Sequence, residues 1–187
     1  MLNQFLDKYI FTNTLTYKQN NFSLVNIPFV IFPTDLLFSL ISDNDINKRK
    51  DLYYKIKESS IKYFMPKFKE LRMDGKKQID FVKTLFIASG WGSIQFIDLD
   101  AEGKKAIVII ENSPFATTLK GKVDFPVDII PRAILASLLE VVFLSEIDCV
   151  ESECKAVNGE KCKLILKPTS EFDFNSAIVR EQLRVEE

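Results

Sequence analysis

All three cysteines of the 187-residue chain lie in one short stretch that begins at Cys149 and ends at Cys162. An odd number of clustered thiols does not form the disulfide framework of a small secreted protein, and inside cells such clusters more often bind a metal. A disulfide is the alternative, because intracellular proteins of hyperthermophiles do form such bonds. The cysteines are therefore the first residues from which chemistry is expected.

Histidine is absent from the sequence. Its absence removes the commonest general base, the usual partner of a catalytic nucleophile and the commonest zinc ligand. Gly90-Trp91-Gly92 and Gly121 do not form a phosphate-binding loop, and the sequence has neither a Gly-x-Ser-x-Gly motif nor a Ser/Lys constellation. The sequence therefore predicts a protein that is not an enzyme.

The composition is that of an ordinary folded protein, with 47% hydrophobic and 27% charged residues. The length suits a single domain over residues 1–187. The net charge of −1 provides no general attraction to nucleic acid or anionic lipid. The longest apolar runs are too short and too polar to span a bilayer, and the N-terminus does not read as a secretory signal. We therefore expect a cytoplasmic protein without a membrane span.

Residues 48–77 form a basic segment, with eleven Lys or Arg against four Asp or Glu. A solvated helix face is the ordinary explanation for such a segment. An acidic partner, nucleic acid or a membrane surface is the alternative. Because no recognised DNA-binding motif accompanies the segment, we expect no direct binding to nucleic acid.

Hydrophobic periodicity predicts the elements that position these residues in the first half of the chain. Residues 11–17 and 22–32 are expected to form a β-hairpin, and Pro33-Thr34-Asp35 should begin a short helix. Amphipathic helices are predicted over residues 46–64 and 77–88, and Pro66 should kink or end the first of them.

The second half is predicted to consist of two further hairpins separated by a helix. Strands 94–99 and 105–111 flank a turn at residues 100–103, and residues 112–126 are read as an irregular flap over a binding site. The helix over residues 128–144 is apolar all round, so it should be buried or shared with a partner. Strands 147–156 and 161–166 flank Asn158-Gly159, and a helical pattern over residues 177–185 follows. The expected fold class is α+β, with a mainly antiparallel sheet and packed helices.

Four pieces of the second half carry a resemblance. The most specific runs from Glu151 to Cys162, where Glu, Cys and Cys stand at positions n, n+3 and n+11 around a glycine turn. The others are Gly90-Trp91-Gly92 before a strand, Asn112-Ser113-Pro114-Phe115 after the next strand, and the apolar helix that begins near Asp128. In these pieces the chain resembles the vinyl-four-reductase (4-vinyl reductase) domain family, whose archaeal members are described as predicted hydrocarbon-binding proteins.

The resemblance covers at least residues 90–166 and implies the TRAPP-like fold, also called the NO-signalling and Golgi-transport ligand-binding fold. Transport-protein-particle subunits of vesicle tethering and the aromatic-sensing domains of phenol-responsive regulators share that fold. These relatives dimerise through helices, and several enclose an apolar molecule. The resemblance thus implies a homodimer, which we expect to form through the predicted helices 46–64 or 77–88.

The resemblance also implies a zinc site. In many relatives a cysteine at the position of Asp128 completes a site with a glutamate and two later cysteines, so the set here is Asp128, Glu151, Cys154 and Cys162, with Cys149 as a nearby substitute. The metal would be structural. The alternatives are an N-cap role for Asp128 and, for Cys154 and Cys162, either packing as small buried hydrophobes or a disulfide.

A ligand pocket is expected in a closed apolar cavity between the helix 128–144 and the strands around Phe96 and Ile109. The candidate lining residues are Trp91, Phe96, Ile109, Phe115, Ile134 and Phe143. The ordinary explanation for such side chains is core packing. The expected function is a non-catalytic sensor of a small hydrophobic or aromatic molecule that acts through a partner regulator. The alternative is a TRAPP-like interaction module whose interior is filled by its own side chains.

Overall fold

The computed structural model describes residues 15–19, 21–24, 27–30, 33–157 and 159–184. Contacts between Cα atoms divide the chain into two units, Met1–Leu37 and Phe38–Glu187. The two units are described separately below. Among the described helices, none combines the length and the apolar character that a membrane crossing requires.

The first unit contains a three-stranded antiparallel sheet in the order β1-β2-β3. The strands are β1 Leu15–Lys18, β2 Asn21–Leu24 and β3 Ile27–Phe29. The predicted opening hairpin is confirmed where the structure describes it, whereas residues 11–14 of its first strand lie outside the described residues. The predicted second strand is two strands, β2 and β3. The predicted helix after Pro33 is confirmed as α2, Thr34–Ile41, which crosses the boundary between the units.

The second unit is built on a four-stranded sheet in which every neighbouring pair is antiparallel. In spatial order its strands are β4 Ser93–Asp100, β5 Lys105–Glu111, β7 Cys162–Pro168 and β6 Ile147–Glu153. The register aligns Phe96, Val108, Leu164 and Glu151 in one row across the sheet. Because side chains that pair across a sheet share a face, this row marks the face that packs on the helices. The α+β prediction is confirmed.

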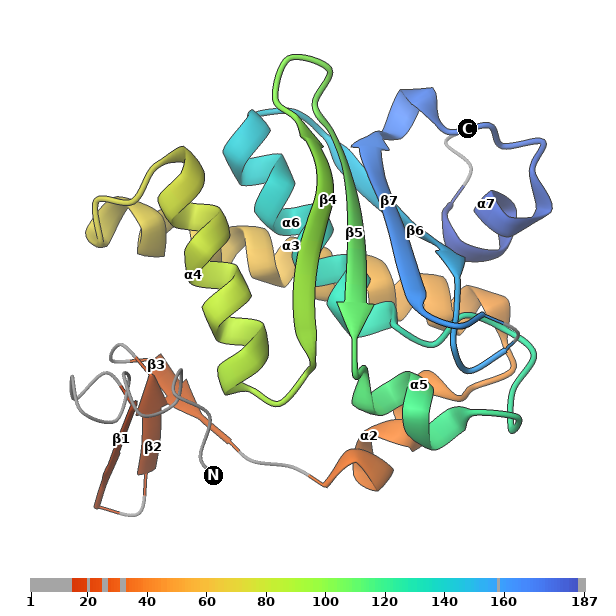
Figure 1. Cartoon of the computed structure of the whole chain (residues 1–187), viewed down its shortest axis with the longest axis horizontal. Coiled ribbons are helices and arrows are strands. Elements are labelled where there is room, and N and C mark those ends of the chain that lie inside the picture. Colours follow the sequence, from red (N-terminus) through yellow and green to blue (C-terminus); the bar gives the residue numbers. More distant parts are fainter. Residues whose placement is uncertain (1–14, 20, 25–26, 31–32, 158, 185–187) are drawn as a thin grey trace. The chain divides into compact units, whose positions relative to one another are not determined.

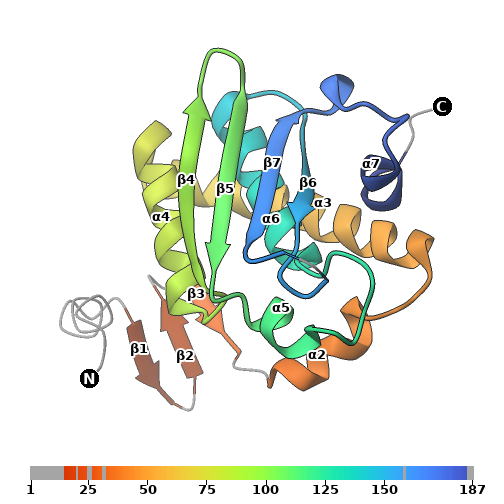
Figure 2. The ribbon, with the colours of Figure 1, turned by 45° about the vertical axis from the view of Figure 1, so that its right-hand side comes forward.

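Three helices lie behind that face of the sheet, as Figures 1 and 2 both show. They are α3 Ile46–Glu70, α4 Gly75–Ala88 and α6 Ile129–Phe143. Every residue from 131 to 139 of α6 is buried, so its predicted burial on all sides is confirmed over these residues, whereas residues 140–143 are half-buried. Helix α6 is therefore the central element of the core.

Two sequence predictions on the helices were wrong. The predicted end of the first helix near Phe64 is wrong, because α3 continues through Pro66 to Glu70; a kink at Pro66, the alternative, stays a prediction. The buried rings of Phe64 and Phe68, two residues before and two residues after the exposed proline, stack with their centroids 5.4 Å apart. This packing holds the helix together where Pro66 lacks an amide hydrogen. The predicted irregular flap contains a helix, α5 Pro114–Leu119, which buries Phe115, Ala116 and Leu119.

The C-terminal part of the chain lies beside β6. It contains the short 3₁₀ helix η1, Thr169–Glu171, and helix α7, Ala177–Gln182. Figures 1 and 2 place α7 next to β6 at the side of the sheet away from β4. The predicted last helix is thus confirmed over residues 177–182.

A buried polar cluster centred on Asp148 joins the helices to the sheet. Lys57 of α3 places its Nζ 3.0 Å from Asp148 Oδ1 and 3.1 Å from Glu140 Oε2 of α6. Tyr53 donates from its hydroxyl to Asp148 Oδ1 at 3.0 Å, and Thr169 donates to Oδ2 at the same distance. Both oxygens of this buried carboxylate therefore have partners, which offsets its loss of hydration. The cluster therefore joins four elements, α3, α6, β6 and η1.

Replacing Asp148 with asparagine is expected to destabilise the protein by about 3 kcal/mol, because it leaves Lys57 buried with only Glu140 as a counter-charge. Denaturant unfolding measures the change. The control is Asp51→Asn, which breaks an ion pair with Arg184 that is half exposed on both sides, and should cost less than about 1 kcal/mol. Equal losses of stability in the two variants would show that the Asp148 cluster stabilises the protein no more than the exposed ion pair does.

Candidate metal centre and ligand groove

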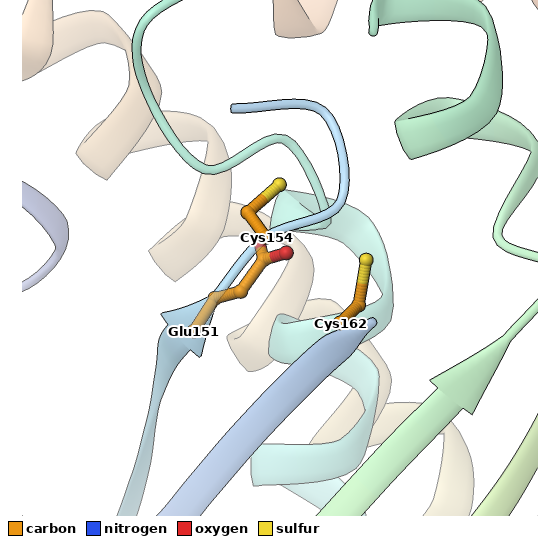
Figure 3. Close-up of side chains that lie close together, drawn as sticks. All are labelled: Glu151, Cys154 and Cys162. Carbon is orange, nitrogen blue, oxygen red and sulfur yellow. The ribbon is translucent and has the colours of Figure 1, made fainter. Parts of the chain in front are cut away.

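Glu151, Cys154 and Cys162 form a compact buried cluster. One carboxylate oxygen and the two Sγ atoms all lie within 4.8 Å of one another. Figure 3 shows the three side chains converging from the end of β6, the turn that follows it and the start of β7. The predicted set of Glu and two Cys is therefore brought together.

Local backbone features produce this convergence. The register of β6 against β7 shifts between Glu151 and Glu153, so a bulge lies between Glu151 and Cys154. The following turn closes through hydrogen bonds from the amides of Val157 and Gly159 to the carbonyl of Cys154, at 3.2 and 2.9 Å. A Cβ atom at Gly159 would lie 2.6 Å from Glu153 Cγ and 2.9 Å from the carbonyl of Lys161, so the turn closes this tightly only with glycine.

Asp128 adjoins the cluster from the start of α6. Its amide donates to Glu151 Oε2 at 3.0 Å, and its Oδ1 accepts from the Ser113 hydroxyl at 2.6 Å. Asp128 occupies the N-cap position of α6, but its side chain makes no capping hydrogen bond. The capping explanation was therefore right about the position and wrong about the side chain. The carboxylate is not one of the group of atoms that lie within 4.8 Å of one another.

Two carboxylate oxygens at this place are buried without a hydrogen-bond partner in the described part of the chain. They are Asp128 Oδ2 and Glu151 Oε1. Buried carboxylate oxygens are costly unless a hydrogen bond or a cation compensates them. Thiolates and carboxylates are the ligands that zinc and similar divalent metals take in closed sites. The residues thus fit a divalent metal, which would join the last hairpin to the start of α6.

The electrostatics of the cluster reflect this crowding. Burial raises the pKa of Asp128, and burial together with the charge of Asp128 raises the pKa of Glu151 well above its usual range. A hydrogen bond with the Cys162 thiol lowers the pKa of Cys154 to about 6, whereas the same pairing raises the pKa of Cys162. Without a cation, the four groups therefore share protons instead of all ionising.

Cys149 lies in β6, two residues before Glu151. It is fully buried, its partner across the sheet is Leu166, and its amide donates to the hydroxyl of Tyr53 at 2.9 Å. The structure does not place its Sγ in the group that Glu151, Cys154 and Cys162 form. All three cysteines are free, so the disulfide alternative is not realised in this structure.

Phe96 and Phe143 line a groove of about 360 Å³ between α4, β4 and the last turn of α6. Ile79, Leu99 and Val142 provide further apolar walls, and the amine of Lys83 lies 5.3 Å from the centroid of the Phe96 ring. A bulge between Phe96 and Asp98 changes the strand alternation. Leu99, and not Asp98, consequently pairs with Ala106 on the helix-facing side of the sheet.

The other four predicted pocket residues do not line this groove. Ile109 is adjacent in β5 to Val108, the partner of Phe96, and therefore points to the opposite face of the sheet. Trp91 packs edge-on against Phe86 at 5.6 Å between centroids. Phe115 and Ile134 are buried in α5 and α6. One closed cavity cannot be lined by both Phe96 and Ile109, because their side chains leave the sheet in opposite directions.

Ser113, Gln182 and Leu99 were not predicted from the sequence as site residues. Ser113 had a signal, since a serine directly before Pro114 is typical of a helix N-cap, and its Oγ does accept from the amide of Ala116. The amide of Glu151 donates to Gln182 Oε1 at 2.8 Å, and Gln182 Nε2 donates to the carbonyl of Glu151 at 3.0 Å. A contact between residues so far apart along the chain leaves no local pattern.

Comparison with known proteins identifies the fold. No protein-family model matches the sequence, and no curated protein matches it. Among solved structures, the chain is similar to the phenol-responsive sensory domain of the transcription activator PoxR with phenol, with a TM-score of 0.73 and 12% identity over 97% of each chain.

Two further structures show the same likeness. One is a vinyl-4-reductase family protein from Methanocaldococcus jannaschii, with a TM-score of 0.50 and 20% identity over 73% of this chain and 81% of that chain. The other is trafficking protein particle complex subunit 3 from Naegleria fowleri covalently bound to palmitic acid, with a TM-score of 0.50 and 10% identity over 72% of this chain and 88% of that chain. The chain therefore has the α+β fold that these sensory, vinyl-4-reductase and trafficking proteins share, and the TRAPP-like expectation is confirmed.

Proposed function

We propose that the chain is a non-catalytic module that binds a small hydrophobic or aromatic molecule in the groove between α4, β4 and α6. The observation that carries this proposal is the apolar lining by Ile79, Phe96, Leu99, Val142 and Phe143. Ligand pockets are concave and mainly apolar, with a few polar groups that orient the ligand. Lys83, beside the Phe96 ring, is suited to that orienting role.

The fold supports the same proposal. The PoxR domain responds to phenol, and the trafficking subunit carries palmitic acid, so proteins of this architecture accommodate both aromatic and aliphatic molecules. In this chain the groove touches the half-buried last turn of α6, a helix that is buried over residues 131–139 and packs against α3 and the sheet. A ligand that orders this turn would change the surface that a partner regulator meets.

Phenol and toluene are expected to raise the melting temperature of the wild-type protein in a saturable way, since a ligand at a hundred times its Kd stabilises by about 2.7 kcal/mol. Val142→Lys should abolish the rise, because it places a charge on an apolar wall, and Phe96→Ala should weaken it. Leu144→Ala is the matched control, since Leu144 is 83% exposed and does not line the groove. The measurement is differential scanning fluorimetry of all four proteins.

If neither compound stabilises the wild-type protein, the ligand-binding proposal is wrong. The TRAPP-like interaction module without a ligand would then be the better description. An equal response in the wild-type protein and in Val142→Lys would place the ligand elsewhere.

We further propose that the cluster holds structural zinc. Glu151, Cys154 and Cys162 would be three of its ligands, and Asp128 would be the fourth. The two unpartnered oxygens of Asp128 and Glu151 support this assignment, as does the mixed thiol and carboxylate set. Bound zinc would take the place of the protons that the ligands otherwise share, and would tie β6, β7 and α6 together.

Protein purified without chelator is expected to contain about one equivalent of zinc, because structural sites are tight enough to survive purification. The Cys154→Ser, Cys162→Ser double variant should lose the metal, whereas the control Cys149→Ser should retain it, since Cys149 lies outside the group of close ligand atoms. Elemental analysis by mass spectrometry gives the ratio. Less than about a tenth of an equivalent in the wild-type protein would contradict a zinc site.

We also propose that the protein is a homodimer in contact through α3 or α4. The support in α3 is that Tyr63 and Met65, which lie on either side of its buried face, are 38% and 51% exposed. A two-fold contact of this kind buries about 1,200–2,000 Å² in total. Light scattering at high micromolar concentration should give the dimer mass for the wild-type protein and a smaller mass for Tyr63→Glu. A monomeric wild-type protein at that concentration would rule the dimer out.

A further inference from the structure

Arg132 is a buried arginine without an acidic partner. It belongs to α6 and is 2% exposed. Its Nη1 donates to Gln182 Oε1 and its Nη2 to the Gln182 carbonyl at 3.4 Å, while its guanidinium lies 4.8 Å from the centroid of the Tyr53 ring. Among the described residues no carboxylate forms a salt bridge with it, and its Nε has no hydrogen-bond partner. Arginines are almost never fully buried unless they are paired, so this positive charge, which acts on Asp128 only at a distance, lacks a direct ion-pair partner in the described part of the chain.

Two more basic residues, both in α3, line the same pocket as Arg132. Arg49 is 7% exposed and stacks on the Phe125 ring with 3.8 Å between its guanidinium carbon and the ring centroid. Among the described residues its salt-bridge partner is the partly exposed Glu181, at 3.4 Å, and the charges of Asp124, Asp43 and Asp45 also act on it. Lys50 is next to it along the helix and is partly buried. Arg49, Lys50 and Arg132 therefore line one small pocket together with one carboxylate, that of Glu181.

Two neighbouring spaces lie beside these groups. Arg49, Lys50 and Arg132 line the smaller one, the inner pocket, together with Phe125, Ile129 and Gln182. Its volume of about 10 Å³ holds about one water-sized group. Arg49, Phe125 and Glu181 line both this pocket and an outer cleft of about 700 Å³, to which Lys122 and Asp124 contribute. The three shared residues make the two spaces neighbours.

We propose that this cleft binds a small organic carboxylate. Its head group would meet Arg49 and Lys50 and place one oxygen in the inner pocket, toward the charge of Arg132. Guanidinium groups match the planar carboxylate in geometry and in charge. A water molecule in the inner pocket could satisfy Arg132 Nε, but it would leave the positive charge without compensation. The flat two-oxygen head also fits a one-group inner pocket better than a tetrahedral phosphate.

The proposal does not depend on the apolar groove. The groove is lined from α4, β4 and the end of α6, whereas the carboxylate cleft is lined from α3, the loop before α6, the start of α6 and residues 181–182. No residue lines both. Failure of one proposal therefore leaves the other unaffected.

The test is isothermal titration of the full chain with acetate, benzoate and inorganic phosphate, at an ionic strength held constant with sodium chloride. We expect saturable binding of a carboxylate, weakened about tenfold or more in Arg49→Gln and in Lys50→Gln. Lys55→Gln is the matched control, because Lys55 is an exposed lysine of the same helix that lines neither space, and its affinity should equal that of the wild type. Arg132 is left unchanged, since its loss could prevent folding.

Three outcomes would overturn the proposal. The first is that neither carboxylate binds more than chloride does. The second is an unchanged affinity in both Arg49→Gln and Lys50→Gln, with circular dichroism showing that the variants fold. The third is a tighter affinity for phosphate than for the carboxylates, which would assign the cleft to another class of anion.

Discussion

The burial of α6 on all sides over residues 131–139 is the constraint on which the rest of this structure depends. A helix that contacts neighbours on every side must satisfy its polar residues within the protein. Asp128 stands at its start, Arg132 in its second turn and Glu140 near its end, and each faces a different neighbour. The candidate metal centre, the proposed carboxylate cleft and the apolar groove all lie along this one helix.

The polar groups around α6 fall into two classes. At the end near Glu140, the cluster of Lys57, Asp148 and Tyr53 is closed, because each charged group has a partner from the protein itself. At the start, three buried side-chain atoms of the described residues lack a partner, and they belong to Asp128, Arg132 and Glu151. Gln182 of α7 connects two of these residues by bonding both Arg132 and the backbone of Glu151. The closed cluster is suited to holding the fold, whereas the open one is suited to binding ions.

The fold is shared with the PoxR sensory domain at only 12% identity, which fits how little of it depends on particular side chains. The sheet needs alternating apolar positions, and the central helix needs apolar residues all round. The candidate sites depend more strongly on particular residues than the fold does. Gly159 is required for close approach of the backbone, and the bulge after Glu151 is required for the direction of its neighbours.

The sequence by itself determined the elements whose signals are local. Periodicity located α4, α6 and the three hairpins, Asn158-Gly159 located the turn that carries Cys154 and Cys162, and the resemblance carried by Glu151 and the two cysteines named a candidate set that the structure does bring together. Only the tertiary structure decided that α3 passes through Pro66, that Leu99 turns toward the helices, and that Phe96 and Ile109 leave the sheet on opposite faces. It also decided that Gln182 reaches Arg132 and that Arg49 joins them in one cleft. Propensity and period act between neighbours in the chain, whereas these outcomes depend on a strand bulge and on packing between distant segments, which leave no local pattern.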